Sequence, residues 1–381
     1  MHRSDLHRLL LEACERVGVV LHTNHLVDDV VSSVDAATIG CTNGATFHSD
    51  IVLAADGLNS RLRQRIVGDA TVPSGYVAYR GTFPISAVPD ASELNDVIAW
   101  LGPKCHFVQY PLRQGEMLNQ VAVFRSPSFG AGDPEWSGPE ELDEAFAGCS
   151  DAVKRVLPYL WRDRHWQMAD RNPTENWIEG RIVLLGDAAH PPLQYLAQGA
   201  CMAIEDAACL GAKALDFVTT LGPGKGWDQA MESYRSQRAP RTARIQTTAR
   251  TWGEVWHVEG VARTLRNELM TQRDTDSYAS PTGCTAIRAE QPTALTVAAD
   301  AEGDVDRAHT STDRACPRLP EGEGAKARSC RGTPAYPRAR CAPVLPLPTL
   351  ALHGDLGVLQ PNTLSCNRIN FRQPCAYSNR W

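Results

Sequence analysis

Hydrophobic and polar positions follow two different periods over the first 278 residues, which predicts both helices and strands. Leu6, Leu9, Leu10 and Ala13 recur at helical spacing, so we expect the chain to open with an amphipathic helix. Two short apolar runs, at 50–56 and 181–186, end at an aspartate and a glycine and are each followed by helix-forming sequence. Such runs are typical of buried parallel strands.

Between these runs, polar and apolar residues alternate, and long helical periods come afterwards. Residues 77–85, 105–110 and 119–125 are expected to form antiparallel strands of a second layer. Residues 202–215 and 228–256 have the period of long helices. Together these elements predict a fold of the α/β (α+β) class.

After Tyr278 the periodic pattern ends, and prolines, glycines and serines interrupt every apolar run. Such a segment buries too little apolar surface to offset its ordering entropy, so residues 279–381 are predicted to be a disordered tail. An ordered disulfide or metal knot is the alternative, because the tail contains Cys284, Cys316, Cys330, Cys341, Cys366 and Cys375. A misjoined coding end would give the same pattern.

Composition narrows the class of partner. The chain is 43% hydrophobic and has a formal net charge of -6 without a long basic run, which favours a small molecule over nucleic acid or a membrane. The opening residues contain neither the apolar core of a signal peptide nor a membrane span, so we expect a cytoplasmic protein. The cysteines are scattered without a Cys-x-x-Cys pair, which predicts no metal site.

The strongest chemical signal is the run Gly-Asp-Ala-Ala-His-Pro-Pro at 186–192, which follows a predicted buried strand and precedes a long helix. A carboxylate at the carboxyl end of such a strand can accept hydrogen bonds from sugar-like hydroxyls. The helix that opens near Gly199 offers unpaired N–H groups that favour negative charge. For an isolated Gly-Asp pair, a turn glycine and a helix-capping aspartate would be the simpler interpretation.

A second run, Asp-Gly-Leu-Asn-Ser-Arg-Leu-Arg at 56–63, also follows a buried strand and enters a helix. Asp56 and Gly57 alone are turn residues, and Ser60 alone is a helix cap. Together with Arg63, these residues would place a carboxylate, a hydroxyl and a guanidinium around one polar ligand.

Both runs resemble the fingerprints of the class A flavoprotein aromatic hydroxylases, the superfamily of p-hydroxybenzoate hydroxylase. The resemblance implies FAD, NADH or NADPH as electron donor, dioxygen, a phenolic acid substrate and a homodimer. It also implies that FAD is bound by Arg3, Asp56, Gly57, Arg63, Gly186, Asp187, Pro192, Gly199 and Ala200. Within this set, Asp187 would hold the ribityl chain, and Asp56 would also support the use of NADH.

More unusual strings are similar to the 3-hydroxybenzoate 6-hydroxylase branch of that family. They lie at 106–111, 119–124, 192–199 and 251–257, and the resemblance covers residues 1–278. It implies hydroxylation of 3-hydroxybenzoate to 2,5-dihydroxybenzoate.

On the predicted strand at 105–110, His106 and Tyr110 lie four residues apart and therefore face the same side. A neutral imidazole can accept a phenol proton near pH 7. With the family match, His106 is assigned as the catalytic base, and Tyr110 and Gln194 orient the carboxylate and phenol of the substrate. A histidine at the edge of the core beside a tyrosine is the alternative.

The sequence also departs from this family, whose members begin with a strand and a Gly-x-Gly-x-x-Gly turn for the FAD pyrophosphate. Neither feature is present, so we expect the chain to begin roughly a hundred residues into the fold and to leave a sheet edge unpaired. Two alternatives follow. The chain is a non-catalytic fragment or half of a split enzyme, or it is a related flavin monooxygenase with another phenolic substrate.

The expected organisation follows the order of these signals. It comprises a partial FAD-binding domain at 1–75, a substrate-binding sheet at 76–178, a return to the FAD-binding domain at 179–220, C-terminal helices at 221–278 and the tail at 279–381.

Overall fold

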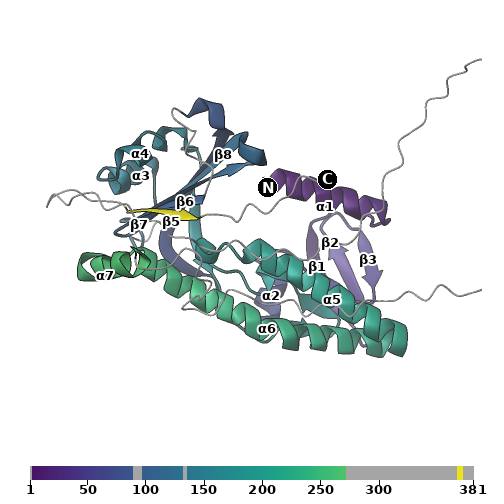
Figure 1. Cartoon of the computed structure of the whole chain (residues 1–381). Coiled ribbons are helices and arrows are strands. Elements are labelled where there is room, and N and C mark those ends of the chain that lie inside the picture. The colour runs from purple at the N-terminus through teal and green to yellow at the C-terminus, as the bar shows by residue number, and fades with distance from the viewer. Residues whose placement is uncertain (1, 89–96, 132–134, 272–366, 372–381) are drawn as a thin grey trace, which may run out of the picture. The chain divides into compact units, whose positions relative to one another are not determined.

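The computed structural model describes residues 2–88, 97–131, 135–271 and 367–371 (Figure 1). All of them belong to one of two compact units, and the second unit, 286–347, lies wholly outside the described residues. The described unit combines helices with three sheets, which confirms the predicted α/β (α+β) class. No helix in this part of the chain is long and apolar enough to cross a membrane.

The first element is the predicted amphipathic helix, α1 (Arg3–Arg16), and a small antiparallel sheet follows it. The sheet consists of β1 (Val27–Ser32), β2 (Ala37–Cys41) and β3 (Thr46–Ser49). This sheet was not predicted from the sequence, although the dipeptide Asn43-Gly44 between β2 and β3 is a hairpin signal. Gly44 has a φ of 84°, a value that glycine adopts without strain.

The two apolar runs form neighbouring parallel strands, as predicted. β4 (Val52–Ala54) pairs in parallel with β11 (Ile182–Leu184), and β10 (Ile178–Glu179) adds an antiparallel strand. The helices α2 (Arg61–Val67), α5 (Gly199–Leu221) and α6 (Pro223–Trp256) follow, and α5 packs along α6 (Figure 1). Because β4 and β11 are parallel, their carboxyl ends bring the Asp-Gly and Gly-Asp runs to one edge.

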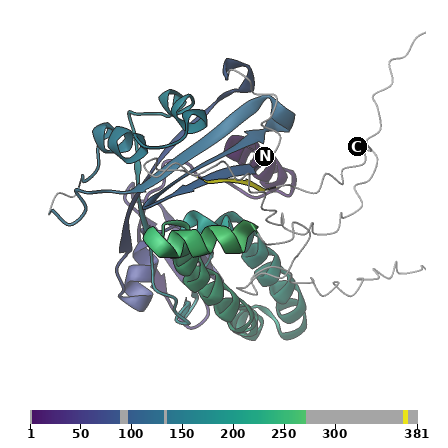
Figure 2. The same ribbon diagram turned by 60° about the vertical axis from the view of Figure 1, so that its left-hand side comes forward.

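The second layer is a six-stranded antiparallel sheet in the order β12-β6-β7-β8-β5-β9. Its strands are β5 (Val72–Pro84), β6 (Val97–Gly102), β7 (Cys105–Leu112), β8 (Met117–Arg125), β9 (Trp166–Asp170) and β12 (Asn367–Phe371). The first face packs on α3 (Pro139–Phe146) and α4 (Asp151–Lys154). The second face packs on α6 and on the 3-10 turn η6 (Gln194–Leu196), with α7 (Gly260–Thr271) on the same side (Figure 2).

The tail prediction differs from the structure in one segment. β12 (Asn367–Phe371) pairs antiparallel with β6, so these five residues form a strand. An edge strand such as β6 presents unpaired backbone N–H and C=O groups to any segment that can extend beside it, which the sequence pattern of the tail does not reveal. The rest of the predicted tail, including its six cysteines, lies outside the described residues, as do 272–278 of the predicted C-terminal helices.

Candidate functional site

The Gly-Asp loop begins where β11 ends, with the 3-10 turn η5 (Gly186–Ala188). Gly186 has a φ of 59°, and its N–H donates to the Asp206 carboxylate over 3.1 Å. The next residue, Asp187, is exposed to solvent, and the protein atoms crowded around it raise the pKa of its carboxyl by desolvation. The loop therefore presents the Asp187 carboxylate at the protein surface, where a ligand can reach it.

A buried ionic cluster on α5 and α6 fixes this loop. The fully buried Asp206 accepts hydrogen bonds from His190 Nε2 at 2.5 Å and from Arg238 Nε at 2.7 Å. Burial alone would raise the pKa of Asp206, but the hydrogen bonds from His190 and Arg238 hold that pKa below its usual value. The charge on Asp206 thus remains, and it orients Gly186 at the start of the loop.

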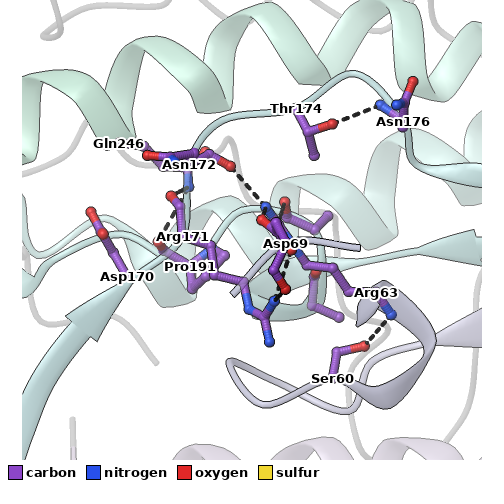
Figure 3. A network of polar contacts seen from close by, with 12 residues as sticks. Ser60, Arg63, Asp69, Asp170, Arg171, Asn172, Thr174, Asn176, Pro191 and Gln246 are labelled. Atoms are coloured by element: carbon purple, nitrogen blue, oxygen red, sulfur yellow. Dashed lines mark hydrogen bonds and ion pairs between the residues drawn. The ribbon is translucent and has the colours of Figure 1, made fainter. Parts of the chain in front are cut away.

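Arg63 was predicted to contact a ligand, but its side chain is fully buried in the protein. Its guanidinium binds Asp69 at 2.6 Å, the carbonyl of Asn172 at 2.8 Å and the carbonyls of Ala188 and Ala189. Figure 3 shows it beside Asp69, in the same network as Arg171 and Gln246. All three guanidinium nitrogens therefore donate within the protein, and Arg63 ties α2 to the Gly-Asp loop.

The residues of the Asp-Gly run cap the start of α2, which is the role that each of them would have in isolation. Ser60 Oγ accepts from Arg63 N at 2.9 Å, and the Asp56 carboxylate accepts from Arg61 N at 3.0 Å. Ser60 is buried, whereas Asp56 is exposed, and Gly57 has a φ of 80°. The structure therefore leaves Asp56 at the sheet edge but does not gather Ser60 and Arg63 around a common ligand.

The opening of α5 supplies the other half of this edge. A Cβ added at Gly199 would lie 3.6 Å from Pro192 Cγ and 3.9 Å from Asp187 Oδ1, so these three residues share one small surface. No side chain caps α5, and the buried Gln198 Oε1 has no hydrogen-bond partner among the described residues. Free helix N–H groups at Gly199 and Ala200 beside the Asp187 carboxylate suit a ligand with both acceptors and hydroxyls, as the flavin and ribityl parts of FAD have.

A second group of polar residues lies on the face of the six-stranded sheet that turns toward η6. His106 and Tyr110 lie on this face of β7, as predicted, and Arg80 reaches it from β5. Arg80 Nη2 donates to Gln194 Oε1 over 3.1 Å, and the Arg80 guanidinium stacks on Trp166 at 5.2 Å from the ring centroid. The structure thus joins Gln194 to Arg80, with Tyr110 close enough to affect the pKa of Arg80.

His106 lies deeper on the same face and has a partner that the sequence did not reveal. His106 Nδ1 is 2.7 Å from Nε2 of His257, the residue that follows α6. The two rings stack, with centroids 5.0 Å apart, and Trp256 meets His106 edge-on at the same distance. Both histidines are buried, and desolvation lowers both pKa values, that of His257 to about 3. Both imidazoles are therefore neutral at pH 7.

This pair should make the stability of the protein depend on pH. In the unfolded chain, histidine takes up protons below about pH 6.5, whereas the folded pair resists protonation. The free energy of unfolding should therefore fall by up to about 1.4 kcal/mol per pH unit for each of the two histidines as pH drops from 6.5 toward 5. Urea unfolding at several pH values would measure this slope. The variant His257→Gln, whose amide can still reach His106, should lose about half of the pair's contribution, and an unchanged slope would contradict the assignment.

Three residues of the site were missed by sequence analysis. Arg80 and His257 were missed because their partners lie 114 and 151 residues away along the chain. A weak signal existed for Asp206, since a carboxylate inside the apolar period of a helix needs a partner. A second weak signal was Gly253, a glycine inside a long predicted helix, which indicates that another segment packs closely there. In the structure that segment contains Tyr195, whose ring a side chain at 253 would overlap.

One hollow in the surface does not belong to this site. A hollow of about 360 Å³ lies at the opposite end of α6, lined by acidic residues, Arg235 and Trp177. The described residues contain no cluster of three or more side chains that could hold a metal ion.

Comparison with known proteins places these features in a family. A family model described as an FAD binding domain matches residues 1–249. A 3-hydroxybenzoate 6-hydroxylase from Aquipseudomonas alcaligenes is 38% identical over 284 residues, which are 73% of this chain and 85% of that protein. A 3-amino-4-hydroxybenzoate 2-monooxygenase from Streptomyces cremeus is 36% identical, over 71% of this chain and 66% of its own length. A salicylate hydroxylase solved with its substrate has a TM-score of 0.57 and 26% identity, over 71% of each chain.

Proposed function

We propose that this chain, which belongs to the family of FAD-dependent aromatic monooxygenases, hydroxylates the ring of a phenolic acid. The best candidate reaction is the conversion of 3-hydroxybenzoate to 2,5-dihydroxybenzoate, with NADH or NADPH and dioxygen as co-substrates. The observation that carries the proposal is one sheet face that carries a neutral histidine, a tyrosine and a glutamine-bound arginine. Such a face can bind both ends of a phenolic acid.

Two groups of residues would hold FAD. Asp187 would accept hydrogen bonds from ribityl hydroxyls, while Gly199 and Ala200 would offer helix N–H groups to the flavin ring and Pro192 would pack on it. Asp56, Gly57, Gly186 and Arg3 complete the proposed set, and Arg63 would act by holding the loop. When bound, FAD would accept electrons from the nicotinamide and use them to activate oxygen.

The roles of the three predicted substrate residues follow from their surroundings. His106 would accept the phenol proton, which raises electron density on the ring to be hydroxylated. Desolvation lowers the pKa of His106, so this base is unprotonated over the whole physiological range. Tyr110 and Gln194 would orient the substrate, and the apolar surroundings contributed by Tyr195 and Trp256 would exclude water.

The test uses the full chain supplied with FAD and NADH. We expect 3-hydroxybenzoate to stimulate NADH oxidation and to yield 2,5-dihydroxybenzoate on chromatography. Benzoate is the matched control, because it keeps the carboxylate but has no phenol proton for His106 to accept, and it should yield no hydroxylated product. Absence of product from every phenolic acid offered would contradict the proposal.

A second substrate class is favoured by one comparison. The 36% identical relative from Streptomyces cremeus is named for an amino-hydroxybenzoate. A ring with an amino group next to the phenol is therefore the alternative substrate, and competition with 3-hydroxybenzoate would rank the two. A homodimer, preference for NADH and a cytoplasmic location also remain proposals.

A further inference from the structure

One cation on the proposed substrate face has no acidic partner among the described residues. Arg80 is solvent-exposed, and its guanidinium is held by Gln194 Oε1 and by the Trp166 ring. Partial desolvation lowers the pKa of Arg80, the nearby Tyr110 raises it, and a second cation, Arg3, lowers it. The charged and titratable groups that act on Arg80 are thus a phenol and another arginine, so the local charge favours an anion.

Strand register places this cation level with the middle of the substrate face, on the second strand from β7. Arg80 pairs with Val121, and Val121 pairs with Val108, so these three residues lie abreast on β5, β8 and β7. On β7, Tyr110 lies two residues beyond Val108 in one direction, and His106 lies two residues away in the other. Because an extended chain advances about 3.3 Å per residue, His106 and Tyr110 are separated by about 13 Å at their Cα atoms. That span accommodates one aromatic ring over Val108, with one substituent directed sideways to Arg80 and another directed along the strand to His106.

The start of α1 lies at the Tyr110 end of the face. Arg113, which follows β7, binds the Asp5 carboxylate through two nitrogens at 2.8 and 2.9 Å. This contact brings the first turn of α1, and with it Arg3, to the end of β7. The carboxylate of Asp5 is therefore occupied by Arg113, while Arg3 adds positive charge near Arg80.

We propose that Arg80 is the specificity-determining residue that binds the carboxylate of an aromatic acid, with the ring over Val108 and the phenol directed toward His106. This inference rests on the proposed function and deepens it, because it predicts selection for acids over neutral phenols. A guanidinium fixed by an amide and an aromatic ring can bind a carboxylate through two parallel hydrogen bonds. Gln194 then acts as both a substrate contact and a support for Arg80.

The test measures binding to the full chain supplied with FAD, by calorimetry, for 3-hydroxybenzoate and its neutral amide, 3-hydroxybenzamide. We expect the wild type to prefer the acid, and Arg80→Gln to weaken acid binding by about tenfold or more while changing amide binding by less than about twofold. Arg80→Lys, which keeps the charge but not the planar fork, should fall between them. Arg16→Gln, at the far end of α1, removes the same charge and should change neither affinity.

Several outcomes would overturn the assignment. Equal weakening of acid and amide binding in Arg80→Gln would mean that Arg80 only supports Gln194, and unchanged binding would mean that it does neither. Failure of the wild type to bind either compound would overturn it as well. Arg80-dependent binding of the acid without any hydroxylated product would uphold this inference and contradict the proposed function. Product formation with an unchanged acid preference in Arg80→Gln would contradict this inference and uphold the proposed function.

Discussion

Replacing His106 by asparagine should lower the rate of phenol hydroxylation by about a hundredfold to ten-thousandfold, the usual contribution of a general base. Asparagine places a polar atom near the position of His106 Nδ1, so the contact with His257 can persist. The variant lacks the second ring nitrogen, which is the one free to receive the phenol proton. The loss should therefore appear in kcat, with little change in the affinity for the acid.

The pH profile separates this catalytic role from a structural one. In His106→Asn, activity should rise as solvent deprotonates the phenol, up to a pH near 10, about the pKa of an ordinary phenol. The activity of the wild type should not depend on this rise in pH, because His106 accepts the phenol proton at neutral pH. His48→Asn, in the separate sheet β1-β2-β3, is the matched control and should keep full activity. A His106→Asn variant with the same profile as the wild type would rule out the base assignment.

Asp206→Asn should destabilise the protein by about 3 kcal/mol or more, because it removes the fully buried acidic partner of Arg238 and leaves that guanidinium with only the partly exposed Glu205. One Asp206 oxygen accepts from Gly186 N and His190, and the other accepts from Arg238. Asparagine has only one acceptor oxygen, so its amide N–H groups would face either Arg238 or the loop. Urea unfolding would measure the loss, and weaker FAD binding should accompany it.

Glu205→Gln provides the matched control for this cluster. Glu205 also binds Arg238, at 2.7 Å, but its side chain is 34% exposed. Since solvent screens exposed pairs, we expect a loss of no more than about 1 kcal/mol. Equal losses in the two variants would show that burial of Asp206 does not determine the stability of the cluster.

Sequence periodicity predicted much of the fold because short-range patterns determine it. The apolar runs at 50–56 and 181–186 could be recognised as buried strands, and the structure pairs them in parallel. The alternating segments around His106 and Tyr110 correctly gave a common face on an antiparallel sheet. The sheet at 27–49 was missed although Asn43-Gly44 marked its hairpin, because its strands are short and few of their residues are fully buried.

The candidate site was less predictable because its contacts join distant segments. Arg63 matched the fingerprint as a ligand residue, but the structure surrounds its guanidinium with Asp69 and three backbone carbonyls. Nothing local distinguishes an arginine that holds a loop from one that faces a ligand. Arg80 and His257 show the converse, since each acquires a partner only after the sheet packs on α6 and η6.

The central claim is that this chain inserts oxygen into the ring of a phenolic acid. The most direct test supplies the full chain with FAD, NADH and 3-hydroxybenzoate under oxygen-18 gas and determines the mass of the product. The account predicts 2,5-dihydroxybenzoate in which the new hydroxyl carries the label from dioxygen. NADH oxidation that yields only hydrogen peroxide, or a product labelled from water, would contradict it.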